Sequence, residues 1–166
     1  MERLLPAIER LLPFQIPLSV DTRSAKVAEA CLNAGATMIN DVSGLTHDPA
    51  MAGLIAEKGC PVVLMHMRGT PATMADHAHY SDLFGEVADE LATRAGTALD
   101  AGIHPDRIIL DPGIGFGKRL EHNLSLLRDG AQLRGPHELA LLWGVSRKSM
   151  FHHLLGREDT SDRLAG

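Results

Sequence analysis

The sequence has 166 residues, of which 45% are hydrophobic and 22% are charged, with a formal net charge of −5. This composition is typical of a globular domain with a core of its own, and the acidic balance argues against a nucleic acid or a membrane surface as a partner. No stretch approaches the length of a membrane span. Cys31 and Cys60 lack metal-type spacing, so we expect reduced thiols in a cytoplasmic protein.

Apolar periodicity alternates between helix-like and strand-like segments along the chain. The predicted helices begin at capping residues Ser24, Asp48 and Ser81 or directly at the start of the chain. They cover residues 1–12, 24–33, 48–58, 81–101 and 121–128, and another begins near residue 151. The predicted strands cover residues 18–20, 38–39, 61–65, 108–110 and 139–145.

Each predicted strand is followed by a polar side chain, in the order Asp21, Asn40, His66, Asp111 and Ser146. Strictly alternating strands and helices predict parallel strands with helices covering the sheet, an α/β fold. In a (β/α)8 TIM barrel the strand ends converge on one face, where such enzymes place their sites. Five strands are fewer than eight, and a complete barrel takes roughly 250 residues. We therefore expect an incomplete TIM barrel.

A glycine-rich loop, Asp111 to Lys118, follows the fourth predicted strand and reads DPGIGFGK. Lys118 stands where a dinucleotide-binding motif needs its third glycine, and the spacing does not fit a P-loop. Glycines in such a loop let a ligand approach the backbone closely. We interpret it as a ligand loop of another kind; a tight turn with an N-capping aspartate is the alternative.

Five motifs occur in a fixed order, each at the end of a predicted strand. They are Ser19-Val20-Asp21-Thr22, Ile39-Asn40-Asp41-Val42, Met65-His66-Met67-Arg68-Gly69-Thr70-Pro71, the loop 111–118, and Gly144-Val145-Ser146-Arg147-Lys148-Ser149. Together they closely resemble dihydropteroate synthase, the folate-pathway transferase that sulfonamides inhibit. The resemblance covers the whole chain and implies strands three to seven of the barrel, as one partial pterin-binding domain over residues 1–166.

The resemblance implies condensation of 6-hydroxymethyl-7,8-dihydropterin pyrophosphate with 4-aminobenzoate to 7,8-dihydropteroate and pyrophosphate. Asp21, Asn40, Asp111 and Lys148 match the catalytic residues that hold the pterin. A carboxylate such as Asp111 suits the adjacent amino and ring N–H groups of the pterin, and an amide such as Asn40 suits a mixed edge. The matching substrate-binding residues are Met65, Gly115, Phe116, Gly144, Arg147 and Ser149.

The resemblance also implies Mg²⁺ as cofactor and a homodimer at full length. The family's magnesium and pyrophosphate ligands lie on its strands one, two and eight, which this sequence does not contain. We therefore expect a piece of a longer enzyme, with no metal ligand of its own. Edge strands exposed in this way invite aggregation. We expect the isolated chain not to be an active, well-folded monomer.

Other interpretations stay open for single residues. Asp21 can be a helix cap, Asn40 and Asp41 can start a turn, and Met65 and Phe116 can be core residues. Arg147 and Lys148 can be a solvated pair. We interpret His66 as structural, and we interpret the remaining paired histidines as solvated rather than metal-binding; they are His77, His79, His152 and His153.

Two other functions fit part of the pattern. A methyltetrahydrofolate:corrinoid methyltransferase would share the aspartate and asparagine on the same fold, although the Phe116 loop and the segment 146–149 argue against it. A non-catalytic pterin-binding chain would bind dihydropterin without forming pteroate.

Overall fold

The structure is a computed structural model that describes residues 2–70 and 72–156. Five parallel strands form one sheet in the order β1-β2-β3-β4-β5, so every strand pairs with its neighbour in sequence. The strands are β1 (Ser19–Asp21), β2 (Met38–Asp41), β3 (Val62–Met65), β4 (Ile108–Asp111) and β5 (Ala140–Leu141).

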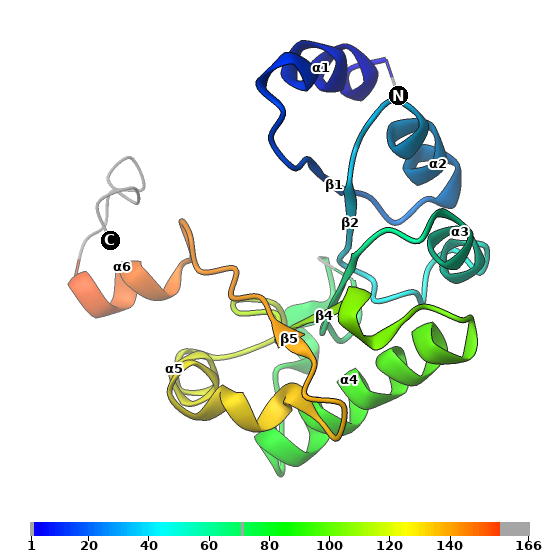
Figure 1. Cartoon of the computed structure of the whole chain (residues 1–166). Helices are drawn as coiled ribbons and strands as arrows, with labels where there is room; N and C mark the ends of the chain where they lie inside the picture. Colours follow the sequence, from blue (N-terminus) through cyan, green and yellow to red (C-terminus); the bar gives the residue numbers. More distant parts are fainter. Residues whose placement is uncertain (1, 71, 157–166) are drawn as a thin grey trace.

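Helices connect the strands and lie on the outside of the curved sheet (Figure 1). The α-helices are α1 (Leu4–Leu11), α2 (Ala25–Asn33), α3 (Met51–Lys58), α4 (Leu83–Asp100), α5 (Leu120–Asp129) and α6 (Met150–Leu155). Short 3-10 helices are η1 (Leu12–Phe14), η2 (Met74–His77), η3 (Pro105–Arg107) and η4 (Gly130–Arg134). Within the described residues the sheet does not close, and no helix is long and apolar enough to cross a membrane. The predicted α/β fold, an incomplete TIM barrel, is confirmed.

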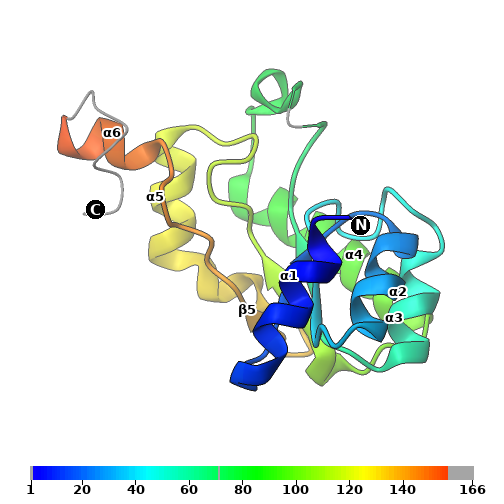
Figure 2. The same ribbon diagram turned by 90° about the horizontal axis from the view of Figure 1, so that it is seen from above.

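Side chains alternate between the two faces of the sheet, as the strand geometry requires. Ile39, Leu64 and Leu110 point to the helices and join a core with Val87 and Leu91 of α4, all of them at most 2% exposed. Full burial of one such side chain contributes about 1.5–3 kcal/mol. The inner face opens between α1 and α6 in Figure 1, and α1 lies in front of the strands in Figure 2. This face carries the other set: Asp21, Asn40, Val63, Met65, Ile109 and Asp111.

The capping differs from the prediction at all three predicted helix starts; α3, for example, begins at Met51 with Ala50 rather than Asp48 as its N-cap residue. Ser24 makes no side-chain cap; the free N–H of Ala25 is instead bound by Asp48 Oδ2, at 2.8 Å. The other Asp48 oxygen accepts from Ala50 N–H at 3.1 Å, so one carboxylate serves both α2 and the start of α3. These N–H bonds, first that of Ala25, lower the pKa of Asp48.

The long helix α4 also begins one residue later than predicted. Asp82, not Ser81, caps it, accepting from Gly85 N–H at 3.1 Å. Glu86 Oε1 in turn accepts from the N–H groups of Ser81 and Asp82, one position beyond the N3 residue that does this in a capping box.

The predicted strand 139–145 is much shorter in the structure. Only Ala140 and Leu141 form β5, paired with Ile109 and Leu110, and Leu142 N–H adds one bond to Leu110 O. Within the described residues β5 has one strand partner, so the apolar run beyond it lacks a second ladder to hold it extended. Ser146 therefore does not directly follow a strand.

The two cysteines, Cys31 and Cys60, are buried and free. Burial raises the pKa of both thiols, which agrees with the expected inert, reduced side chains.

Candidate functional site

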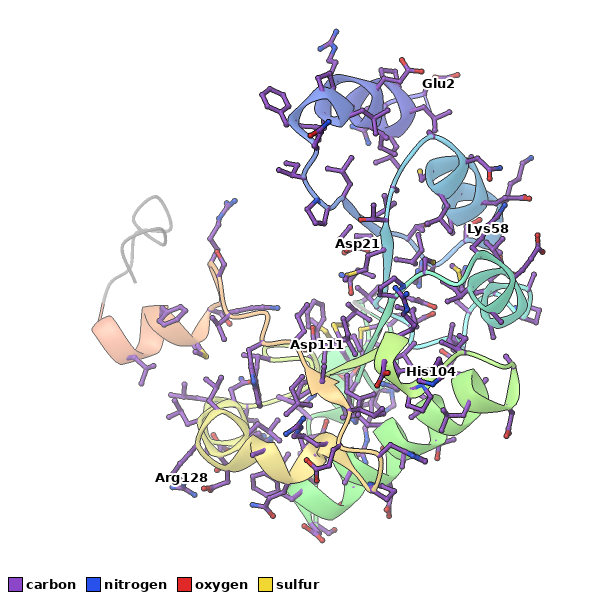
Figure 3. All side chains as sticks on the ribbon, viewed as in Figure 1. Glu2, Asp21, Lys58, His104, Asp111 and Arg128 are labelled. Carbon is purple, nitrogen blue, oxygen red and sulfur yellow. The ribbon has the colours of Figure 1, made fainter. Side chains whose placement is uncertain are left out.

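Asp111 ends β4 and is 6% exposed on the inner face of the sheet, where Figure 3 labels it together with Asp21. Its Oδ1 accepts from Gly113 N–H at 2.8 Å. Burial raises the pKa of the Asp111 carboxyl, while this N–H and the Lys148 and Lys118 charges oppose the rise. The carboxylate is therefore fixed in direction by its own loop and is poorly hydrated.

Lys148 and Phe116 lie beside Asp111, although Lys148 is far away in sequence. The Lys148 ammonium lies 4.0 Å from the centroid of the Phe116 ring, a cation–π contact. Burial lowers the pKa of Lys148, and Asp111 counteracts this. A carboxylate, an ammonium and an aromatic ring thus share one end of the sheet.

Gly115 and Gly144 leave space that side chains would fill. A Cβ at Gly115, whose φ is +80°, would lie 3.1 Å from Lys148 Cδ. A Cβ at Gly144 would lie 3.6 Å from Asp111 Oδ2, so this glycine keeps the approach to that oxygen open. Both positions agree with a ligand that comes close to the backbone.

Asp21 and Asn40 form a second group at the ends of β1 and β2, where they are register partners. Asn40 Nδ2 donates to Asp21 Oδ2 at 3.4 Å. Asn40 Oδ1 is buried and has no hydrogen-bond partner among the described residues. Burial raises the pKa of Asp21, helped by the neighbouring Asp41 charge and opposed by Asn40.

Asp41 differs from its neighbour Asn40 because the strand turns its side chain to the opposite face. It is fully buried and accepts from Ser43 N–H, Ser43 Oγ and Leu45 N–H at 2.6–2.9 Å. The turn expected for this pair therefore belongs to Asp41, while Asn40 faces the site.

Met65, Arg147 and Ser149 complete the set of predicted residues. Met65 is 2% exposed and pairs in register with Asp111, so it lies on the same inner face. Arg147 and Ser149 are exposed, and Arg147 has a left-handed backbone with φ +59°. Neither of these two makes a side-chain hydrogen bond or ion pair to another described residue. Among the described residues, the structure thus joins neither of them to Asp111 by a hydrogen bond or an ion pair.

His66 is fully buried below the site, as the structural interpretation predicted. Its Nδ1 lies 2.9 Å from Lys118 Nζ, and its Nε2 lies 3.1 Å from Glu90 Oε2. That second contact is not aligned as a hydrogen bond. Burial, followed by the Lys118, Arg94 and Arg68 charges, lowers the pKa of His66 to about 2, so the ring is neutral.

Several supporting residues went unassigned in the sequence. Arg94 of α4 donates to the backbone oxygens of Met65 and Met67, and Asn123 of α5 accepts from Gly115 N–H at 2.8 Å. Arg68 binds Glu86 and Glu90 on α4, in contacts of 2.6–2.7 Å. Each partner is more than a dozen residues away or on another element, so no local sequence pattern predicts these contacts.

The described side chains do not form a metal site. Within residues 2–70 and 72–156, no group of three or more His, Cys, Asp or Glu side chains could hold an ion. The described part of the chain does not fit a Mg²⁺ site on its own. His152 and His153 have side chains outside the described residues.

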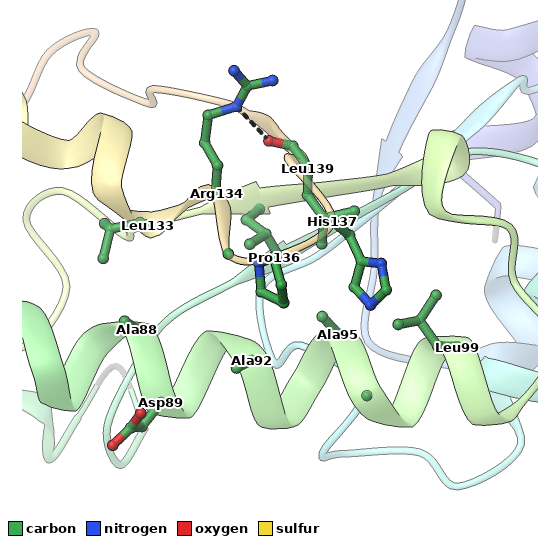
Figure 4. A pocket seen from close by; sticks show the side chains of 13 residues that line it. Ala88, Asp89, Ala92, Ala95, Leu99, Leu133, Arg134, Pro136, His137 and Leu139 are labelled. Carbon is green, nitrogen blue, oxygen red and sulfur yellow. Dashed lines mark hydrogen bonds between the residues drawn. The ribbon is translucent and has the colours of Figure 1, made fainter.

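A cavity of about 350 Å³ lies away from these residues, on the face covered by helices (Figure 4). Small side chains of α4, such as Ala88 and Ala92, line one wall, and Pro136 and Leu139 line the other. Arg134 closes its rim by donating to Leu139 O at 3.0 Å. None of the predicted site residues lines this cavity.

Comparison with known proteins identifies the family. The chain matches the pterin binding enzyme family over residues 1–166. It belongs to that family.

Relatives in the pterin binding family include the dihydropteroate synthase of Synechocystis sp., which is 41% identical over 167 residues. That alignment covers 100% of this chain and 57% of the relative. The dihydropteroate synthase of Thermus thermophilus has been solved in complex with 4-aminobenzoate and in complex with 6HMPPP. Both structures match with a TM-score of 0.90 and 45% identity, covering 99% of this chain and 63% or 64% of theirs. The chain thus spans less than two thirds of these relatives.

Proposed function

We propose that this chain is the pterin-holding part of a dihydropteroate synthase, with residues 1–166 belonging to one TIM-barrel domain. The main support is the set of acceptors at one end of the parallel sheet. Asp111 is buried there with one oxygen held by Gly113, and Asn40 Oδ1 is buried without a partner among the described residues. A buried acceptor left unpaired costs about 1–3 kcal/mol. A ligand rich in N–H groups offsets that cost.

The edge of a dihydropterin that carries the amino group offers such donors. Asp111 accepts from the amino group and the adjacent ring N–H, a charge-assisted pair of bonds. Asn40 accepts through Oδ1, and Lys148 donates to the carbonyl oxygen and a ring nitrogen. Asp21 accepts from the remaining N–H. Met65 packs against the ring, and Gly115 and Gly144 leave room for it.

The reaction joins the exocyclic methylene carbon of the pterin to the arylamine nitrogen. The carbon–oxygen bond to pyrophosphate breaks, and both electrons leave with the pyrophosphate. The resulting cation is captured by the amine of 4-aminobenzoate, which then loses a proton. Asp21 and Asp111 stabilise the positive charge on the pterin because they are fixed before it develops.

The arylamine lies next to Phe116 and Ser149 in this proposal, and the Arg147 guanidinium stacks on the pterin. Mg²⁺ and a homodimer stay predictions for the full-length protein. No step above depends on either.

A turnover assay tests the proposal. The protein is expressed from its genomic reading frame, with any flanking codons, and is given 6-hydroxymethyl-7,8-dihydropterin pyrophosphate and 4-aminobenzoate. We expect 7,8-dihydropteroate and pyrophosphate in equal amounts. Dihydropterin binding without pteroate would indicate a non-catalytic pterin-binding chain. Methyl transfer from methyltetrahydrofolate to cobalamin would indicate the methyltransferase instead.

A further inference from the structure

Lys118 ends the glycine-rich loop and has all of its hydrogen-bonding capacity used inside the protein. Its ammonium contacts His66 Nδ1 at 2.9 Å, Phe116 O at 3.1 Å and Gly113 O at 3.2 Å. An ammonium has three donors and no acceptor, so no donor is left for a ligand. This separates Lys118 from Lys148, whose ammonium has only the Phe116 ring and the nearby Asp111 charge among the described residues.

The two carbonyl groups that Lys118 binds belong to the residues that shape the site. Gly113 donates its N–H to Asp111 Oδ1, so fixing Gly113 fixes the direction of that carboxylate. Phe116 carries the ring that contacts Lys148 at 4.0 Å. One side chain thus restrains both the acceptor assigned to the pterin and the ring assigned to the arylamine.

The third contact anchors Lys118 to the rest of the fold. His66 follows β3 and is fully buried, with its Nε2 3.1 Å from Glu90 on α4. Glu90 is bound in turn by Arg68, through Nε at 2.7 Å. Lys118 therefore connects the loop after β4 to the end of β3 and, through His66, to α4. Neither element is next to this loop along the chain.

The charges around Lys118 are balanced across several elements. Asp111 on β4 and Glu90 on α4 favour its charged form, whereas Arg94 on α4 and Arg68 after β3 oppose it. Burial is the largest influence and lowers the pKa of Lys118 to about 7. In its neutral form the amine still donates to both carbonyl groups and accepts from His66 Nδ1, so the loop contacts persist in both forms.

We propose that Lys118 is a positioning residue: it holds Gly113 and Phe116 so that Asp111 and the aromatic ring face the two substrates together. The proposal rests on the function proposed above. It predicts that loss of the Lys118 side chain weakens the binding of both substrates, because Lys118 holds both halves of the site. Small misplacements of substrate groups cost roughly 10- to 100-fold in rate.

Steady-state kinetics of the protein expressed from its full reading frame test this role. We expect Lys118→Met to raise KM for both substrates and to lower kcat/KM for each by about tenfold or more. Lys26→Met, the same change at an exposed lysine, should leave both values unchanged. For Lys118→Ala, added propylammonium should restore affinity for both substrates, whereas 1-propanol, which is of similar size but has one donor in place of three and no charge, should not. Unchanged KM values, or equal rescue by the alcohol, overturn the proposal.

A measurement on the wild type separates this proposal from the proposed function. With ¹⁵N-labelled histidine at about pH 6, below the pKa of Lys118, we expect a neutral His66 ring with its proton on Nε2. The same His66 tautomer and Nδ1 chemical shift in the wild type and in Lys118→Met would overturn the positioning role, because they would show that Lys118 and His66 share no hydrogen bond. Absence of turnover by the wild type, with the expected His66 signal, would refute the function and leave the Lys118 contacts standing.

Discussion

Two regions of the site differ in how many of their hydrogen-bonding groups are paired within the protein. In the loop after β4, the Asp111, Gly113 and Lys118 groups bind one another, and Asn123 holds Gly115. At the ends of β1 and β2, by contrast, Asn40 Oδ1 is buried without a described partner. The first region is preorganised before any ligand arrives, whereas the second depends on the ligand to complete its hydrogen bonds. Preorganised donors and acceptors are what stabilise developing charge without further rearrangement.

The largest expected effect is the loss of stability when a side chain is added at Gly113, in the loop after β4. A Cβ at Gly113, where φ is +70°, would lie 2.0 Å from the backbone oxygen of His66, which cannot move without breaking the end of β3. We expect Gly113→Ala to lower the free energy of unfolding by about 3 kcal/mol or more in urea melts. Gly59 has φ +61° and nothing within 4 Å of its Cβ position, so Gly59→Ala should cost only about 1 kcal/mol. Equal losses would contradict the tight packing of the loop.

The two regions should also differ in the ligand affinity that they supply. Asp111→Asn replaces one acceptor of a charged pair with a donor, so we expect dihydropterin to bind about 10- to 150-fold more weakly. Asn40→Ala removes a neutral acceptor and should cost only about 2- to 10-fold. Isothermal titration of both variants measures the difference. Asp106→Asn, at a side chain 86% exposed, is the matched control. A larger loss at Asn40 than at Asp111 would reverse the comparison.

The pH dependence of stability reports on the protonation of His66, the buried side chain that contacts Lys118 of the loop. His66 has a pKa of about 2 in the folded protein against 6.5 ordinarily. Between these values the unfolded chain binds one more proton, so the free energy of unfolding decreases as pH falls below about 6.5, by up to about 1.4 kcal/mol per pH unit.

His66→Asn removes this contribution, and its pH profile should be flatter than that of the wild type below pH 6.5. His47→Asn, at an exposed position, is the control and should keep the wild-type slope. Parallel profiles for wild type and His66→Asn would show that the buried ring does not remain neutral.

Much of the fold could be predicted because local sequence patterns determine most of its helices and strands. Strands of buried apolar residues ended by Asp21, Asn40 and Asp111 needed only the periodicity of the chain. The pterin binding family was identified from the same motifs. The alternation of faces also explains why Asn40 and Asp41, adjacent in sequence, serve a site and a turn respectively.

Three of the differences from the prediction share one cause, which is that tertiary contacts override local signals. Asp48 reaches 23 residues back to bind the start of α2, so Ser24 is not needed as a cap. The apolar run after β5 forms only a short strand because pairing, not composition, sets strand length. Lys118 and His66 are 52 residues apart, so the sequence motifs contained both without showing that they meet.

The smallest expected effect concerns Phe116, whose backbone belongs to the preorganised loop and whose ring is assigned to the arylamine in the proposed function. Phe116→Ala removes the cation–π contact to Lys148 and the surface assigned to the arylamine. We expect KM for 4-aminobenzoate to rise about 2- to 10-fold while dihydropterin affinity stays unchanged. Phe14→Ala, at a ring 69% exposed, is the matched control and should change neither. Equal losses for both substrates would mean that the ring, like the Lys118 ammonium, supports the whole site rather than one substrate.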